Sequence, residues 1–264
     1  MTFDELDRKM RVFETLNDPV VLPGVYIVAR IDGRGFTKLT KERHAFEAPF
    51  DVRFRDHMVA TTAHLMECGF QVVYGYTQSD EISLLMHRDE TAFARKVRKF
   101  NSILAGEASA KFSLLLGDLA AFDCRVCQLP KAELVRDYFR WRNEDAHRNA
   151  LSAHCYWMLR KSGAGVNEAT DRLLGMSTTD KNELLFRGGV NFNDLPYWQK
   201  RGTGLYWETY EKSATNPKTG QTVTATRRRL KHDFDLPMRE AYGEVRRGIA
   251  RTEQHLKPRR GARM

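Results

Sequence analysis

Apolar residues recur along the chain with the two periods that distinguish helices from strands. Near the N-terminus, Phe3, Leu6, Met10 and Phe13 are spaced by three and four residues, which predicts a short amphipathic helix over residues 2–15. Between residues 25 and 129, β-branched runs alternate with stretches of helical spacing. The predicted elements there are a strand at 25–31, a helix at 51–68, strands at 70–76 and 82–86, a helix at 93–115 and a strand at 122–129.

This order of elements is the split βαβ, or ferredoxin-like (βαββαβ), pattern of an α+β protein. It is also the core pattern of the palm domains of nucleic-acid polymerases and nucleotidyl cyclases. Because crossover connections are nearly always right-handed, few topologies remain, and we expect the first and third strands to be antiparallel neighbours. The end of the first strand and the hairpin between the second and third strands then lie at the same end of the sheet.

Beyond residue 130 the spacing of apolar residues is mainly helical as far as residue 186. Two short runs, 205–210 and 222–226, predict a hairpin around the turn residues 216–220. A basic helix is expected over about residues 238–256. We therefore predict a palm with helical and hairpin additions. Its parts are a catalytic domain with the N-terminal helix at 1–130, a helical extension of the same catalytic unit at 131–211, and a basic appendage at 212–264.

The composition is that of an ordinary soluble globular protein, with 264 residues, 42% hydrophobic and 29% charged. No stretch approaches the ~18 apolar residues of a membrane-spanning helix, so no membrane partner is expected. The four cysteines predict free thiols and a cytoplasmic location. The net charge of +9 lies entirely in residues 212–264, which carry 14 Lys or Arg and 5 Asp or Glu. Such a tail predicts a nucleic-acid partner, with a solubilising tail as an equal alternative.

Three acidic residues are expected at the shared end of the sheet. Asp32 follows the first strand, and Asp80 and Glu81 lie in the hairpin. Carboxylates held close together repel one another unless a cation intervenes, and Mg²⁺ binds one or two carboxylates together with water and phosphate oxygens. Two such ions promote phosphoryl or nucleotidyl transfer. The alternative is that Asp32 and Asp80 are ordinary turn residues.

Two further segments indicate contact with phosphate. Gly33 and Gly35 let backbone N–H groups approach an anion closely, although the pattern is not an established phosphate-loop motif. Arg95 and Lys99 are expected on one face of the predicted helix at 93–115, where they would meet a triphosphate or an RNA 5′ end. An exposed, solvated face is the alternative. The Cys-x-x-Cys pair at 124–127 lies within a predicted strand, where residues three apart face opposite sides, so we predict core thiols in preference to a zinc site.

Five ordered motifs resemble those of the tRNA(His) guanylyltransferase family and its bacterial and archaeal "like" proteins, which are 3′-to-5′ polymerases. The motifs are Arg30–Phe36 (RIDGRGF), Tyr76–Glu81 (YTQSDE), Phe122–Arg125 (FDCR), Asp137–His147 (DYFRWRNEDAH) and Asp180–Leu184 (DKNEL). The resemblance extends from about residue 5 to about residue 210. Because the motifs keep the family's order and spacing, together they are far more specific than any one of them alone.

The resemblance implies a polymerase-like palm that holds two Mg²⁺ ions, uses ATP or GTP, acts on tRNA and assembles as a homotetramer. The implied metal ligands are Asp32, the backbone carbonyl of Gly33, and Asp80, and Glu81 belongs to the same catalytic motif. The implied nucleotide-binding residues are Gly33, Arg34, Gly35, Phe36, Thr37, Ser79 and Asp80. The implied phosphate- or tRNA-binding residues are Arg95, Lys99, His147, Asn149, Lys181 and Asn182.

The implied reaction activates the 5′-monophosphate of a tRNA with ATP or GTP, and the 3′-hydroxyl of an incoming nucleotide then attacks that 5′ end. Three departures from the family pattern favour repair of truncated tRNA 5′ ends over an enzyme dedicated to tRNA(His). The HINN stretch is His147-Arg-Asn-Ala150 here, a family lysine is replaced by Ala48, and a family histidine is replaced by Thr37. The alternatives are a nucleotidyl cyclase or another two-metal palm enzyme, and a non-catalytic RNA-binding module.

Overall fold

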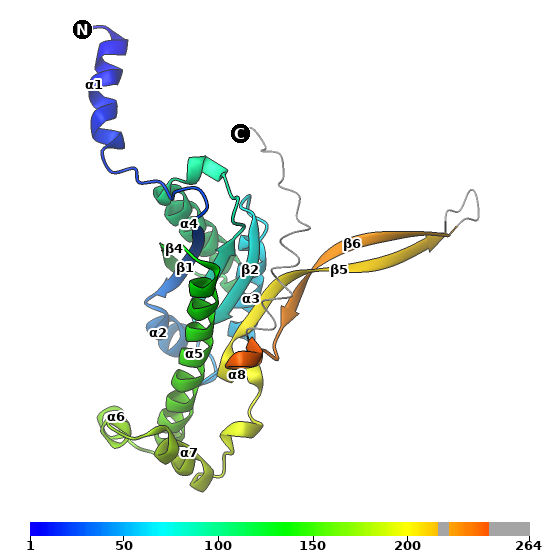
Figure 1. The fold of residues 1–264 in the computed structure, drawn as a ribbon. Helices are drawn as coiled ribbons and strands as arrows, with labels where there is room; N and C mark the ends of the chain where they lie inside the picture. Colours follow the sequence, from blue (N-terminus) through cyan, green and yellow to red (C-terminus); the bar gives the residue numbers. More distant parts are fainter. Residues whose placement is uncertain (216–221, 243–264) are drawn as a thin grey trace.

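An antiparallel sheet of six strands forms the centre of the protein in a computed structural model that describes residues 1–215 and 222–242 (Figure 1). The strand order across the sheet is β4-β1-β3-β2-β5-β6. The strands are β1 (Tyr26–Arg34), β2 (Val72–Gln78), β3 (Glu81–Met86), β4 (Ala121–Leu129), β5 (Thr203–Thr215) and β6 (Thr222–Asp233).

The first four strands have the order β4-β1-β3-β2 with antiparallel pairing throughout, as in a ferredoxin-like fold. The crossover helices α3 (Val52–Leu65) and α4 (Val97–Leu116) cover one face of the sheet. Both helices share a buried core with the alternate positions Ile27, Ala29 and Ile31 of β1. These three positions are apolar because every second residue of a strand points to the same face. The predicted α+β fold class is confirmed.

Helix α5 (Ala132–Lys161) crosses the opposite face of the sheet. Its residues Val135 and Phe139 share a second buried core with Val28 of β1 and Tyr74 of β2. The far end of α5 carries a smaller helical layer, which is held to it by two further apolar clusters. This layer comprises α6 (Val166–Leu173) and α7 (Thr178–Arg187), and the short helix α8 (Tyr197–Arg201) leads into β5.

Strands β5 and β6 extend the sheet beyond the ferredoxin-like unit. β5 pairs with β2 through residues 203–206, and the remainder of the two strands projects as a long ribbon (Figure 1). The predicted hairpin is confirmed, but its strands are longer than the apolar runs because cross-strand hydrogen bonding continues into polar sequence. The predicted boundary between residues 211 and 212 therefore falls inside β5. The predicted turn at 216–220 and the predicted basic helix beyond residue 242 lie outside the described residues.

The N-terminal helix α1 (Phe3–Thr15) forms as predicted, and a capping box between Thr2 and Glu5 begins it. None of its residues is buried: Phe3 is 79% exposed and Phe13 is 68% exposed. Figure 1 shows α1 projecting away from the sheet. Because an isolated helix of this length is only marginally stable in water, its apolar face is suited to contact with another chain.

Among the described helices, none combines the length and the hydrophobicity that spanning a bilayer requires.

All four cysteines are free. Cys124 packs against the core under α3 and α4, whereas Cys127 packs against the core under α5, so the two thiols face opposite sides of β4 as predicted. Burial raises the pKa of Cys124 to about 12, which makes it an unreactive core thiol.

Candidate active site

The end of β1 and the turn between β2 and β3 lie side by side at one end of the sheet. Asp32 pairs in register with Glu81, and the backbone N–H of Gly33 donates a hydrogen bond to the carbonyl oxygen of Asp80 over 3.0 Å. The topology expected from the sequence thus brings Asp32 and Asp80 together. The predicted end of the strand at residue 31 is wrong, because pairing with β3 and β4 continues through Asp32. The chain turns only at Gly35, whose φ is 73°.

A tight turn presents Asp80 at this end of the sheet. Gln78 pairs with Glu81, so Ser79 and Asp80 alone form the turn. Ser79 is exposed and has a left-handed φ of 52°, as two-residue hairpin turns require. Its hydroxyl donates a hydrogen bond to Oδ1 of Asp80 over 3.1 Å. Ser79 therefore orients the Asp80 carboxylate.

Three carboxylates lie in one row across adjacent strands, because Asp123 of β4 pairs with Asp32 and Asp32 pairs with Glu81. Burial, with the neighbouring Glu81 charge, raises the pKa of Asp32. Burial also raises the pKa of Asp80, and the charge of Asp32 contributes to that rise. Negative charge is concentrated and poorly solvated here, an environment that a divalent cation would relieve. Asp123 lies in the Phe122–Arg125 motif, but no role for it was predicted from the sequence.

The donor set at this end of the sheet fits Mg²⁺. Asp32 and Asp80 offer two carboxylates and Gly33 offers a backbone carbonyl, and Mg²⁺ commonly binds one or two carboxylates while keeping several waters. Within residues 1–215 and 222–242, no group of three or more His, Cys, Asp or Glu side chains is arranged to hold a metal. Two carboxylates and one carbonyl supply fewer ligands than the octahedral shell of Mg²⁺ needs, so this set suits a cation that takes its other ligands from water and the phosphates of a nucleotide.

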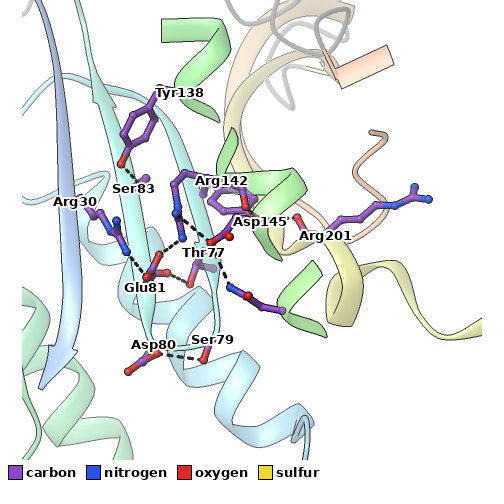
Figure 2. Close-up of polar contacts among 12 residues, drawn as sticks. Arg30, Thr77, Ser79, Asp80, Glu81, Ser83, Tyr138, Arg142, Asp145 and Arg201 are labelled. Atoms are coloured by element: carbon purple, nitrogen blue, oxygen red, sulfur yellow. Dashed lines mark hydrogen bonds and ion pairs between the residues drawn. The ribbon is translucent and has the colours of Figure 1, made fainter. Parts of the chain in front are cut away.

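Both carboxylate oxygens of Glu81 are bound by arginines (Figure 2). Oε1 accepts a hydrogen bond from Arg30 of β1, and Oε2 accepts one from Nη2 of Arg142 in α5 over 2.5 Å. Glu81, implied by the resemblance to belong to the catalytic motif, is therefore paired with two cations here. Neither arginine was singled out from the sequence, although Arg30 lies in the first motif and Arg142 in the Asp137–His147 motif.

Phe36 fixes the loop that follows β1. Its buried ring lies 6.0, 5.2 and 4.9 Å from the ring centroids of Phe54, Phe112 and Phe122. A Cβ atom at Gly33 would lie 2.5 Å from the Phe36 ring, so only glycine fits at that position. The other predicted nucleotide-binding residues of the loop are exposed, namely Arg34, Gly35 and Thr37.

A cleft of about 200 Å³ opens beside the turn. It is lined by residues of the predicted nucleotide site, which are Phe36, Thr37, Ser79 and Asp80. Two tryptophans that the sequence analysis did not identify also line it, and cations lie against both: Arg55 is 4.7 Å from the Trp198 ring and Lys41 is 5.1 Å from the Trp157 ring. Aromatic walls, an acidic turn and two cations suit a nucleotide, because its base is planar and its phosphates are anionic.

Arg95, predicted to bind phosphate, has a structural role instead. It is 7% exposed, and its φ of 58° places it before the start of α4, so it does not share a helical face with Lys99. Its guanidinium donates hydrogen bonds of 2.6–3.2 Å to four backbone carbonyls, those of Val21, Val25, Arg88 and Glu90. The phosphate-binding expectation for Arg95 is therefore wrong. Lys99 is half-buried, with its Nζ 5.5 Å from the Phe93 ring.

The four remaining predicted RNA or phosphate contacts lie on helices and not on the strands that carry the acids. His147 and Asn149 belong to α5, and Lys181 and Asn182 belong to α7. His147 packs edge-on against Phe192 at 5.1 Å, and burial lowers the pKa of its imidazole. The structure thus places these four residues on α5 and α7, apart from the acidic end of the sheet.

Comparison with known proteins places the chain beside one family. A family model described as tRNAHis guanylyltransferase matches residues 7–130, and one described as Thg1 C terminal domain matches residues 133–240. The tRNA(His) guanylyltransferase of Debaryomyces hansenii is 34% identical, covering 71% of this chain and 76% of its own length. A probable tRNA(His) guanylyltransferase of Drosophila melanogaster is 36% identical, covering 71% of this chain and 69% of its own length.

Solved structures agree with these relatives. A bacterial tRNA(His) guanylyltransferase-like protein in complex with ATP is 27% identical, with a TM-score of 0.70, and covers 94% of this chain and 98% of that one. A second structure of that description is in complex with GTP. The tRNA(His) guanylyltransferase of Saccharomyces cerevisiae is 28% identical, with a TM-score of 0.68, and covers 74% of this chain and 91% of that one.

Proposed function

This chain belongs to the tRNA(His) guanylyltransferase family, and we propose that it is a nucleotidyltransferase that adds nucleotides to the 5′ end of tRNA in the 3′-to-5′ direction. The observation that carries the proposal is the hydrogen bond from the Gly33 N–H to the Asp80 carbonyl. It holds Asp32 and Asp80 together at one end of a palm-like sheet, where a two-metal nucleotidyl transfer needs its ligands.

The metal in this proposal is Mg²⁺, held by Asp32, the backbone carbonyl of Gly33, and Asp80, with two ions taking part. Bound Mg²⁺ would neutralise charge on the reacting phosphorus and lower the pKa of the attacking hydroxyl. The raised pKa values of both aspartates support this assignment, because each marks a carboxylate whose charge lacks sufficient compensation in the protein alone. Ser79 supports it by orienting Asp80.

The nucleotide, ATP or GTP, occupies the cleft beside the turn in this proposal. Thr37 and Ser79 contribute hydroxyls to the cleft wall, and Trp157 and Trp198 contribute ring surfaces. The similar bacterial protein solved with ATP and with GTP supports a nucleotide in this fold.

One experiment tests the activity and separates it from its alternatives. A 5′-monophosphorylated tRNA that lacks its first nucleotide is incubated with Mg²⁺, ATP and each labelled nucleoside triphosphate in turn. We expect extension at the 5′ end with wild-type protein and none with Asp80→Asn. A cyclic product formed from nucleotide alone would instead identify a cyclase, and tRNA binding without any product would identify a non-catalytic module.

We further propose that the substrates are truncated tRNAs in general, so that the reaction repairs 5′ ends. Ala48 and Thr37 replace a lysine and a histidine of the family pattern, and both line the cleft. Ala150 ends the altered HINN stretch on α5. Truncated tRNAs of several identities are therefore expected to be extended at rates within a few-fold of one another. A strong preference for intact tRNA(His) awaiting its extra guanosine would contradict this part of the proposal.

The β5–β6 ribbon is proposed to grip the tRNA backbone. Register pairs Tyr206 with Lys231 and Tyr210 with Arg227, with Arg229 between the two cations, so these side chains share one face of the ribbon. All three cations are exposed, and Arg229 lies 5.1 Å from the Tyr210 ring and pairs with Glu208 of the same face at 2.5 Å. Cations interleaved with aromatic rings are typical of surfaces that bind phosphate and stack on bases.

Removing the positive charges of that face tests whether the ribbon binds the tRNA backbone. In the triple variant R227Q/R229Q/K231Q, tRNA affinity should fall and the slope of log affinity against log salt should decrease by about 2 to 3, because each phosphate contact contributes 0.7–0.9. The matched control R88Q/K131Q/R136Q removes three exposed cations elsewhere. An equal loss in both variants would show a general charge effect and contradict the assignment to the ribbon.

A homotetramer is the proposed assembly. The exposed apolar face of α1 supports it, because a helix that buries none of its residues gains stability by packing against another copy. Light scattering on the purified protein should give a mass close to four times 30.5 kDa. Phe3→Ser together with Phe13→Ser should lower that mass if α1 takes part. A monomeric mass for the wild type would contradict the tetramer.

A further inference from the structure

We propose that Glu81 is a positioning residue, clamped between Arg30 and Arg142, that ties helix α5 to the turn carrying Asp80, and that it is not a ligand of the metal. The inference deepens the proposed function and rests on it. Glu81 directly follows Asp80 in the chain and is the first residue of β3. Whatever holds Glu81 therefore also limits the movement of Asp80.

Two arginines from different elements bind the Glu81 carboxylate (Figure 2). Arg30 approaches Oε1 from the neighbouring strand, and Arg142 approaches Oε2 from the helix above at 2.5 Å. The exposed fractions of the three side chains are 17% for Arg30, 25% for Glu81 and 8% for Arg142. Charge-assisted hydrogen bonds to partly desolvated groups are short and strong. For Glu81 to reach a metal it would have to leave both arginines, and a buried charge without its partner is costly.

Other contacts hold the same piece of α5 in place. The second nitrogen of Arg142, Nη1, lies 3.3 Å from Asp145, and its guanidinium lies 4.7 Å from the Trp141 ring. The neighbouring Asn143 donates from Nδ2 to the carbonyl of Arg201 over 3.0 Å. Arg142 is thus held in position by contacts other than its ion pair with Glu81.

Two residues of β2 also help to hold the turn in place. The hydroxyl of Tyr76 donates a hydrogen bond to the backbone carbonyl of Arg201 over 2.9 Å. The hydroxyl of Thr77 donates one to the backbone carbonyl of Glu81 over 3.0 Å. Since His147 lies on α5 five positions after Arg142, RNA contacted by this helix and the metal-binding turn are joined by one rigid element. A shift of α5 on substrate binding would be transmitted to Asp80 through Glu81.

The first test is metal binding, which needs no turnover. Mn²⁺ alone is titrated into each protein, and free Mn²⁺ is followed by its EPR signal. Glu81→Gln and Arg142→Gln should bind Mn²⁺ within about threefold of wild type, whereas Asp32→Asn and Asp80→Asn should weaken binding at least tenfold. If Glu81→Gln loses binding as Asp80→Asn does while Arg142→Gln, which breaks the same clamp, keeps it, Glu81 is a metal ligand and the proposal is overturned.

The second test is a double-mutant cycle on 5′ extension. Glu81→Gln and Arg142→Gln should each lower kcat by 10- to 100-fold. Because both changes break the same clamp, kcat of the double variant should lie within about threefold of kcat of the less active single variant. Losses that multiply would overturn the clamp. Arg142→Lys keeps one ion pair and should recover part of kcat. It also serves as the folded variant if Arg142→Gln does not fold.

A matched control separates the clamp from any loss of charge on α5. Arg140, two residues before Arg142, is exposed and pairs with Glu144 at 2.7 Å. Arg140→Gln should leave kcat and Mn²⁺ binding unchanged, and an equal loss there would overturn the proposal. If wild type shows no 5′ extension, the proposed function fails, and the Mn²⁺ titration still decides whether Glu81 is a ligand. The two failures are therefore distinguishable.

Discussion

The backbone N–H of Gly33 donates to the backbone carbonyl of Asp80 across 3.0 Å, and this contact joins the end of β1 to the β2–β3 turn. It lies outside the regular pairing of β1 with β3, whose last pair is Asp32 with Glu81. The contact leaves both aspartate side chains at one end of the sheet with raised pKa values. Several consequences of this arrangement can be measured.

Asp32→Asn and Asp80→Asn should each lower the rate of 5′ extension by at least about 10³-fold, because a metal ligand is lost while the shape of the side chain is kept. Neither change should lower the melting temperature in EDTA, because each removes a desolvated charge whose pKa is already raised. The control is Asp171→Asn on α6, an exposed position. Full activity in Asp80→Asn would contradict the two-metal assignment.

Asp51 should make stability depend on pH in acid. Hydrogen bonds from Arg53 lower the pKa of Asp51 from 3.8 to about 2. A lowered folded pKa means that the stabilisation is complete above the unfolded pKa and is lost as the pH falls from about 4 through about 2. Asp51→Asn should therefore cost about 2 kcal/mol in unfolding free energy at pH 7. Urea titrations should show the difference shrinking below about 1 kcal/mol at pH 2, and a constant difference would contradict the assignment.

Gly33→Ala should damage the loop after β1. The added methyl group would lie 2.5 Å from the Phe36 ring, so the ring must move out of its aromatic cluster. We expect a loss of about 1–3 kcal/mol in stability and a marked loss of 5′ extension. Gly35→Ala is the matched comparison, because Gly35 has a left-handed φ but no atom within 4 Å of its Cβ position. It should cost only about 1 kcal/mol, and the double variant G33A/F36L should regain stability over Gly33→Ala.

Arg95→Ala should destabilise the protein without a specific effect on nucleotide binding. Its removal leaves buried backbone carbonyls without donors, which we expect to cost about 3 kcal/mol. Arg95→Lys should not restore stability, because an ammonium group cannot reproduce the fork of the guanidinium. Lys99→Ala should leave urea stability nearly unchanged. If Arg95→Ala folds normally but raises KM for the nucleotide, the structural role is wrong.

The arrangement of the site could be predicted because it depends on short-range patterns. Apolar periods located the strands and helices of the palm, and the handedness of crossovers left few topologies, which predicted that the first and third strands are neighbours, as β1 and β3 are. That order alone brings Asp32 to the hairpin that carries Asp80. The loop from Gly33 to Phe36 was also identified, since two glycines after a strand mark a tight backbone path.

The sequence by itself therefore determined which backbone segments meet, whereas only the tertiary structure decided what the charged side chains do there. Glu81 was expected at the acidic end of the sheet as part of the catalytic motif, and its pairing with Arg142, 61 positions away, was not predicted. Arg95 was expected to face phosphate, but it binds the carbonyl of Val21, 74 positions away. Periodicity records which face of an element is buried. It does not record which distant donor or acceptor lies within hydrogen-bond reach, and a charged group's role depends on that partner.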